Sequence, residues 1–76
     1  MSIQEIHQNI VNRKPQIAKS IKEIGYTPDP ELDEWETFDD MIDLNFCTEN
    51  GQVQCYAYPV VNGLTQTNPE FIVKIT

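Results

Sequence analysis

The chain of 76 residues is long enough for one small domain, and at 39% hydrophobic residues it is too apolar for an unfolded tail. Its formal net charge of −7 disfavours direct binding to nucleic acid, because phosphates would be repelled, and no stretch is apolar enough to span a membrane. We therefore expect one globular domain over residues 1–76. Because the N-terminus lacks the basic and apolar regions of a secretory signal, we expect it in the cytoplasm.

An amphipathic helix is predicted for residues 2–24. Isoleucine recurs at helical spacing along one side, at positions 3, 6, 10, 17, 21 and 24. Ser2 and Glu5 fit a capping box at its start, and Gly25 is placed to end it in a left-handed conformation. Pro15 interrupts this pattern, since an internal proline removes a hydrogen bond and costs roughly 3 kcal/mol. We expect a kink or a break near Pro15, with two helical pieces that bury one shared face.

The segment from Asp29 to Asp43 holds eight of the twelve acidic residues and no basic one. Prolines at positions 28 and 30 exclude a regular helix just before it and indicate a linker. Apolar side chains then recur at helical spacing, at Leu32, Trp35, Phe38 and Ile42. This spacing favours a short helix that begins at Pro30 with Asp29 as its cap; an extended segment is the alternative.

Two strands are predicted on either side of Asn50-Gly51, within residues 42–61. Asn-Gly favours a two-residue type I′ turn, since both turn positions adopt positive φ and the twist of the turn matches that of the strands. Pairing outward from the turn gives one largely apolar face, with Thr48 opposite Val53, Phe46 opposite Cys55, Leu44 opposite Ala57 and Ile42 opposite Pro59. The other face receives Asp43, Asn45, Cys47, Gln54, Tyr56 and Tyr58.

A second Asn-Gly, at Asn62-Gly63, predicts another tight turn that leads into a short strand at Leu64-Thr65. Asn68-Pro69 interrupts the chain before a last strand within residues 71–76. In this strand Phe71, Val73 and Ile75 share one face to be buried and alternate with Ile72, Lys74 and Thr76. Together these signals predict an α+β fold. An N-terminal helix, kinked or broken near Pro15, packs on a three- to four-stranded antiparallel β-meander.

The sequence holds no motif for catalysis, cofactor binding or metal binding. His7 is the sole imidazole and lies in the helical segment, away from the acidic run. The acids from Asp29 onward begin like a calcium-binding loop, but Glu34 stands where that loop requires glycine. Cys47 and Cys55 lie on opposite faces of one hairpin, so we expect two free thiols rather than a disulfide or a zinc site. We predict no enzyme, no cofactor and no metal.

The charge is polarised along the chain. Residues 1–25 hold four basic and two acidic side chains, a balance of +2, whereas residues 26–76 hold ten acidic and one basic, a balance of −9. An acidic run is most often a solvated face, but aromatic side chains placed among the acids are typical of interfaces. The residues predicted to bind a partner are Glu31, Asp33, Glu34, Trp35, Glu36, Asp39, Asp40, Asp43, Tyr56 and Tyr58.

These features predict a small, acidic, non-catalytic regulatory protein that docks on a basic surface of another protein. As an inhibitor, such a protein would present carboxylates in place of phosphates and occlude a nucleic-acid-binding site, a form of nucleic-acid mimicry. The alternative is a structural accessory subunit or a homo-oligomer that completes its core at an edge strand or along the isoleucine side of the helix. Salt separates the two, because charge-driven docking weakens with ionic strength and an apolar interface barely responds.

Overall fold

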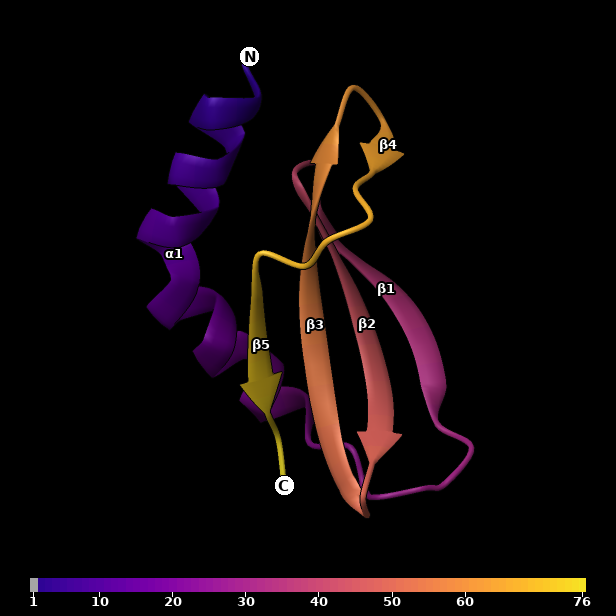
Figure 1. The fold of residues 1–76 in the computed structure, drawn as a ribbon. Helices are drawn as coiled ribbons and strands as arrows, with labels where there is room; N and C mark the ends of the chain where they lie inside the picture. The colour runs from indigo at the N-terminus through magenta and orange to yellow at the C-terminus, as the bar shows by residue number, and fades with distance from the viewer. Residues whose placement is uncertain (1) are drawn as a thin grey trace.

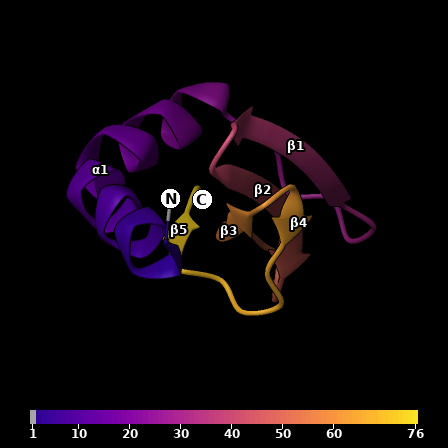
Figure 2. The same cartoon turned by 90° about the horizontal axis from the view of Figure 1, so that it is seen from above.

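A computed structural model describes residues 2–76 as one helix packed on a curled antiparallel sheet of five strands (Figure 1). In chain order the elements are α1 (Ile3–Ile24), β1 (Asp33–Asp39), β2 (Ile42–Glu49), β3 (Gln52–Val61), β4 (Leu64–Thr65) and β5 (Phe71–Lys74). Seen from above, α1 lies along one side of the sheet (Figure 2). The predicted α+β fold is confirmed.

The two ends of α1 are those that the sequence predicts. Ser2 Oγ accepts a hydrogen bond from the backbone N–H of Glu5 at 3.2 Å, which caps the first turn. Gly25 ends the helix in the left-handed conformation, with φ of 69°. The buried side of the helix consists of Ile6, Ile10, Ile17 and Ile21.

Pro15 lies within α1 rather than between two helices. The expected break is wrong, because one continuous helix runs from Ile3 to Ile24, and a kink at Pro15 is not shown. Proline removes the hydrogen bond that the carbonyl of Val11 would otherwise accept. Since Val11 and Pro15 are both exposed, this part of the helix faces solvent and water can solvate the carbonyl.

The central hairpin, β2 with β3, has the predicted register. The pairs on its apolar face are Thr48 with Val53, Phe46 with Cys55, Leu44 with Ala57 and Ile42 with Pro59. At the first turn, Asn50 and Gly51 have φ of 54° and 75°; at the second, Asn62 and Gly63 have φ of 52° and 77°. Both Asn-Gly pairs are therefore confirmed as two-residue hairpin turns with positive φ at each position.

The hydrophobic core lies between α1 and the apolar face of the central hairpin. Phe46, Cys55 and Ala57 are completely buried there, together with the helix isoleucines. Tyr26, which follows the helix, packs its ring on that of Phe46 with 4.4 Å between centroids. Burying each large apolar side chain of this kind contributes about 1.5–3 kcal/mol to folding.

β1 is the main correction to the sequence-based expectation. The short helix predicted from Pro30 is wrong; the extended alternative is right, because residues 33–39 pair antiparallel with β2. Leu32 and Phe38 are an even number of residues apart, so a strand places them on one side, and both pack against the core. Trp35 is an odd number of residues from each and lies on the opposite face. Hydrogen bonding to β2 thus overrides a helical spacing of apolar residues.

The last part of the sheet extends beyond a simple meander. β4 pairs with the end of β3, at Val60 and Val61, and covers only two residues. The chain then returns, and β5 pairs with a different part of the same strand, residues 54–57. The sheet therefore has five strands rather than three or four, and β1 is its long free edge.

Candidate protein-binding face

The sheet face opposite α1, which we call the outer face, gathers side chains from four strands. Its middle row, read across β1, β2, β3 and β5, consists of Trp35, Asn45, Tyr56 and Ile72. The neighbouring row toward the Asn50-Gly51 turn consists of Asp33, Cys47, Gln54 and Lys74. The row on the other side consists of Thr37, Asp43 and Tyr58.

Three aromatic rings of these rows form what we call the aromatic strip: Trp35, Tyr56 and Tyr58. The ring centroids of Trp35 and Tyr58 are 5.1 Å apart, and those of Tyr56 and Tyr58 are 6.4 Å apart, both in tilted arrangements. Trp35 is 56% exposed, and Ile72, which lies opposite Tyr56 on β5, is 49% exposed. A cluster of large, partly exposed side chains on one face is typical of a binding surface.

Carboxylates border the aromatic strip, and hydrogen bonds hold them in place. Asp33 accepts from the side-chain amide of Asn45 at 2.8 Å, and Asp43 accepts from a hydroxyl of β4. Glu49 accepts from the phenol of Tyr56 at 3.1 Å. This hydrogen bond to Glu49 raises the pKa of Tyr56, so the ring stays neutral beside the carboxylates. The outer face thus combines an aromatic centre with an ordered acidic border.

Two of the predicted site residues, Glu34 and Glu36, lie on the other face of β1. Glu36 accepts a hydrogen bond from the phenol of Tyr26 at 2.9 Å. Burial, followed by the hydrogen bonds to Glu36 and Glu34, raises the pKa of Tyr26. These two acids therefore line the core side of the free edge rather than the aromatic strip.

The other predicted residues lie at the ends of β1. Asp39 accepts a hydrogen bond from Arg13 Nη2 at 2.6 Å and another from the backbone N–H of Met41 at 2.8 Å, so it links α1 to the turn after β1. Glu31 and Asp40 are exposed in the turns that flank β1. The predicted residues that the structure brings together on the outer face are Asp33, Trp35, Asp43, Tyr56 and Tyr58.

Three outer-face residues were missed by sequence reasoning: Thr37, Ile72 and Lys74. The alternation of the last strand does indicate that Ile72 and Lys74 share one face. It does not reveal which strand lies beside them, because a loop without a short turn signal precedes β5. Thr37 was missed because its segment was expected to be helical.

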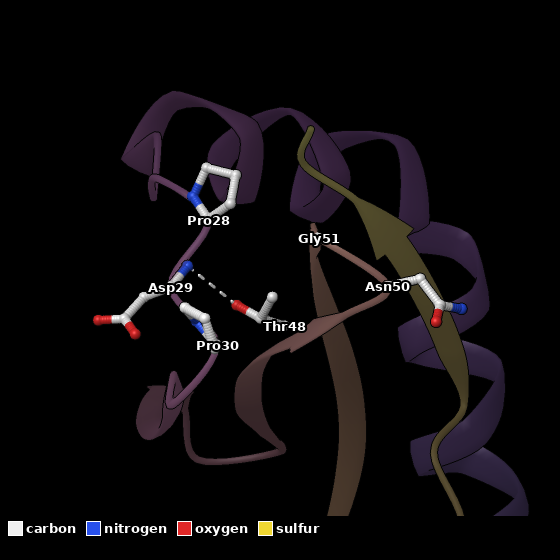
Figure 3. A pocket seen from close by; sticks show the side chains of 6 residues that line it. All are labelled: Pro28, Asp29, Pro30, Thr48, Asn50 and Gly51. Carbon is white, nitrogen blue, oxygen red and sulfur yellow. Dashed lines mark hydrogen bonds between the residues drawn. The ribbon is translucent and has the colours of Figure 1, made fainter.

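A cavity of about 400 Å³ lies between the linker at residues 28–30 and the Asn50-Gly51 turn (Figure 3). There the backbone N–H of Asp29 donates to Thr48 Oγ1 at 3.3 Å. The Asp29 carboxylate points away from Thr48 (Figure 3). The lining therefore holds one carboxylate, that of Asp29, and one hydroxyl, that of Thr48, which do not point toward each other.

Both cysteines are free thiols, as predicted, with Cys47 half-buried and Cys55 fully buried. Burial raises the pKa of Cys55 to about 12 and also raises the pKa of Cys47, so neither is an activated nucleophile. Within residues 2–76, no three His, Cys, Asp or Glu side chains are grouped as a metal ion would require. The one helix in this range is not apolar enough to cross a membrane.

No protein-family model matches the sequence, and comparisons with curated proteins and with solved structures give no match either. Function is therefore inferred from the geometry and charge of the outer face and of the β1 edge.

Proposed function

We propose that the protein is a non-catalytic binding module that docks its outer face on a basic surface of another protein. The observation that carries this proposal is the aromatic strip, whose rings lie 5.1 and 6.4 Å apart beside the carboxylates of Asp33 and Asp43. Large aromatic side chains provide most of the contact energy at many interfaces. Carboxylates around them select a positively charged partner.

The distribution of charge over the molecule also supports docking of a basic partner on the outer face. The acidic part of the chain forms the sheet and its turns, whereas the four basic residues before Gly25 belong to α1 on the other side (Figure 2). One of these, Arg13, already pairs with Asp39. Lys74 is the one basic residue in the three rows of the outer face. A basic partner would therefore be steered toward this face.

Inhibition of a nucleic-acid-binding protein is the specific form of this function that we propose. Proteins that bind nucleic acid carry basic surfaces shaped for regularly spaced phosphates. The ordered carboxylates of the outer face offer such a surface an alternative set of anions, and the aromatic strip adds contacts that do not depend on phosphate. The module would then regulate its partner by occupying the nucleic-acid site.

A structural accessory subunit, or a homo-oligomer of this chain, is the alternative function. Exposed apolar residues favour it, since Ile72 is 49% and Leu64 is 70% exposed. Two copies that meet through the outer face would, however, bring Asp33 and Asp43 of each close together. Their repulsion is relieved by salt, so self-association would strengthen as ionic strength rises, whereas docking on a basic partner would weaken.

Affinity capture from extract of the native cell, followed by reconstitution with the purified partner, tests the proposal. The double variant Trp35→Ala/Tyr58→Ala removes the aromatic strip, and Gln16→Ala, exposed on α1, is the matched control. We expect wild type and Gln16→Ala to retain one basic protein that the double variant loses. The affinity of the purified partner for wild type should fall roughly tenfold or more between about 50 and 300 mM salt.

Two outcomes would contradict the docking proposal. Retention of the same protein by the double variant and by wild type would place the interface elsewhere. Self-association of the purified chain that strengthens as salt rises, together with capture of no basic protein, would favour the homo-oligomer.

A further inference from the structure

Within residues 2–76, β1 has one edge with no bonded strand. In the sheet order β1-β2-β3-β4 its one neighbour in this range is β2, and its first five residues are exposed. The backbone N–H of Thr48 donates to the carbonyl of Leu32 at 3.4 Å, which makes these residues a hydrogen-bonded pair. In an antiparallel ladder such pairs alternate, so Glu34 and Glu36 also bond to β2. The backbone groups that point to the open edge are therefore those of Asp33, Trp35 and Thr37.

The side chains of these three residues lie on the outer face. A strand added beside β1 would consequently extend that face and place its own side chains next to Trp35 and Asp33. On the other side of the added strand, the neighbours would be Glu34 and Glu36. β1 carries four acids and no basic residue in its sequence DEWETFD. Positive side chains on either face of the added strand would thus meet carboxylates.

Charge argues against a second copy of the chain as the added strand. If two β1 strands paired, acids of one copy would lie beside acids of the other, and like charges that face each other across a sheet are destabilising. Charged residues on an edge are a common protection against such self-pairing. A basic segment meets no such repulsion. The seven residues of β1 also match the usual length of a strand, so an ordinary extended segment can cover the edge.

We propose that an extended segment of a partner protein, bearing lysine or arginine, binds to β1 as an additional antiparallel or parallel strand. This inference rests on the proposed function, since it names the binding mode and the partner chemistry within it. Backbone hydrogen bonds to Asp33, Trp35 and Thr37 supply affinity, as in other cases of strand addition. A cationic side chain of the added strand lies over the exposed ring of Trp35, with the Asp33 carboxylate two residues away on the same face.

Synthetic peptides test this mode directly, because Trp35 is the sole tryptophan and its fluorescence reports binding at β1. The probe is a ten-residue peptide in which lysine or arginine alternates with valine or threonine. One control has the same sequence with N-methyl groups on alternate amides, which preserves the charge and blocks strand pairing. A second control replaces the basic residues with glutamate. We expect the unmodified basic peptide to bind about tenfold or more tightly than the methylated one, and the acidic one not to bind.

Hydrogen exchange on the protein gives a second readout. Binding should slow amide exchange at Asp33, Trp35 and Thr37, with a smaller change at Glu34 and Glu36, which already bond to β2. Thr37→Pro removes one outward N–H at a position where an edge strand tolerates proline, and Thr37→Val retains it. The proline variant should lose about tenfold in peptide affinity, while the valine variant binds like wild type. If the proline variant does not fold, the exchange pattern of the wild type decides.

Equal affinity for the two basic peptides would overturn strand addition, since it would reduce binding to charge alone. Absence of binding by either peptide, or protection outside β1, would overturn it as well. These failures differ from failure of the proposed function. The captured protein could still depend on Trp35 and Tyr58 and on salt, in which case the outer face binds its partner without an added strand.

Discussion

β1 and β2 lie side by side in the same sheet and differ in almost everything else. β2 has neighbours on both edges, and its inward residues Ile42, Leu44 and Phe46 are almost completely buried under α1. β1 has one neighbour among the strands of residues 2–76, and its first five residues are exposed. The centre of the sheet therefore provides most of the packing that stabilises the fold, while the edge carries the unpaired backbone groups and the charge that a partner can use.

The centre should be the most sensitive part of the molecule, and Phe46→Ala tests it. Phe46 is 0% exposed, so its truncation leaves a cavity and should cost about 3–5 kcal/mol. A domain of 76 residues has a free energy of unfolding of only roughly 4–11 kcal/mol. We expect urea unfolding, followed by far-ultraviolet circular dichroism, to show loss of most of the stability. Phe46→Leu, which keeps more of the volume, should lose less; equal losses would contradict a tightly packed centre.

The Asn50-Gly51 turn of the central hairpin should tolerate less change than the Asn62-Gly63 turn, which leads into β4. Gly51 has φ of 75° with open space around its Cβ position, so Gly51→Ala is penalised by the backbone alone, at about 1–2 kcal/mol. Gly63 has nearly the same φ, 77°, and the same open space, but it closes only the two-residue β4. Local opening of β4 can relieve the strain there. Urea unfolding should therefore show a smaller loss for Gly63→Ala, and a larger one would mean that β4 is integral to the cooperative unit.

The central hairpin could be predicted residue by residue because its information is local. Asn50-Gly51 fixes the turn, the turn fixes the register, and the register assigns Phe46 and Cys55 to one face. The second Asn-Gly turn and both ends of α1 were equally accessible, since a cap or a turn depends on a few adjacent residues.

The strands that pair with β1 and β5 could not be predicted in the same way, because these neighbours are distant in the sequence. The strand expected within residues 71–76 is itself confirmed as β5. Leu32, Trp35 and Phe38 fit a helix locally, and only the presence of β2 makes the strand favourable. For the same reason the candidate site was predicted in part. The aromatic and acidic residues were identified by type. Only the strand pairing shows that the Trp35 ring contacts that of Tyr58, whereas Glu36, on the other face, accepts a hydrogen bond from Tyr26.

At the edge, Trp35→Ala should have a small effect on stability. Trp35 is 56% exposed, and its close aromatic neighbour is Tyr58 at 5.1 Å. Such a pair is worth about 0.5–1.5 kcal/mol beyond the buried area, so we expect a loss of about 1 kcal/mol. Circular dichroism is the suitable probe, since the variant has no tryptophan. A loss comparable to that of Phe46→Ala would make Trp35 a folding residue and remove the basis for treating it as a contact for partners.

The smallest effect is expected at the turn after β1, where Asp39→Asn and Asp40→Asn form a matched pair. Asp39 contacts Arg13 at 2.6 Å, with both side chains 32% exposed, and partly exposed pairs of this kind contribute about 0.2–1 kcal/mol. Asparagine keeps an oxygen that can accept from the backbone N–H of Met41, so the substitution removes mainly the charge. Asp40 is exposed in the same turn, and its neutralisation should leave stability unchanged.

A double-mutant cycle isolates this contact. In an Arg13→Gln background, Asp39→Asn should have no further effect on urea unfolding, and high salt should shrink its effect in wild type. If Asp39→Asn costs the same without Arg13, the carboxylate stabilises the turn rather than the link to α1. The outcome also determines how the acidic edge can be tested for binding. Asp39 serves the fold, so its neutralisation mixes stability with association, whereas Asp40→Asn changes the field that a basic partner meets and leaves the sheet as it is.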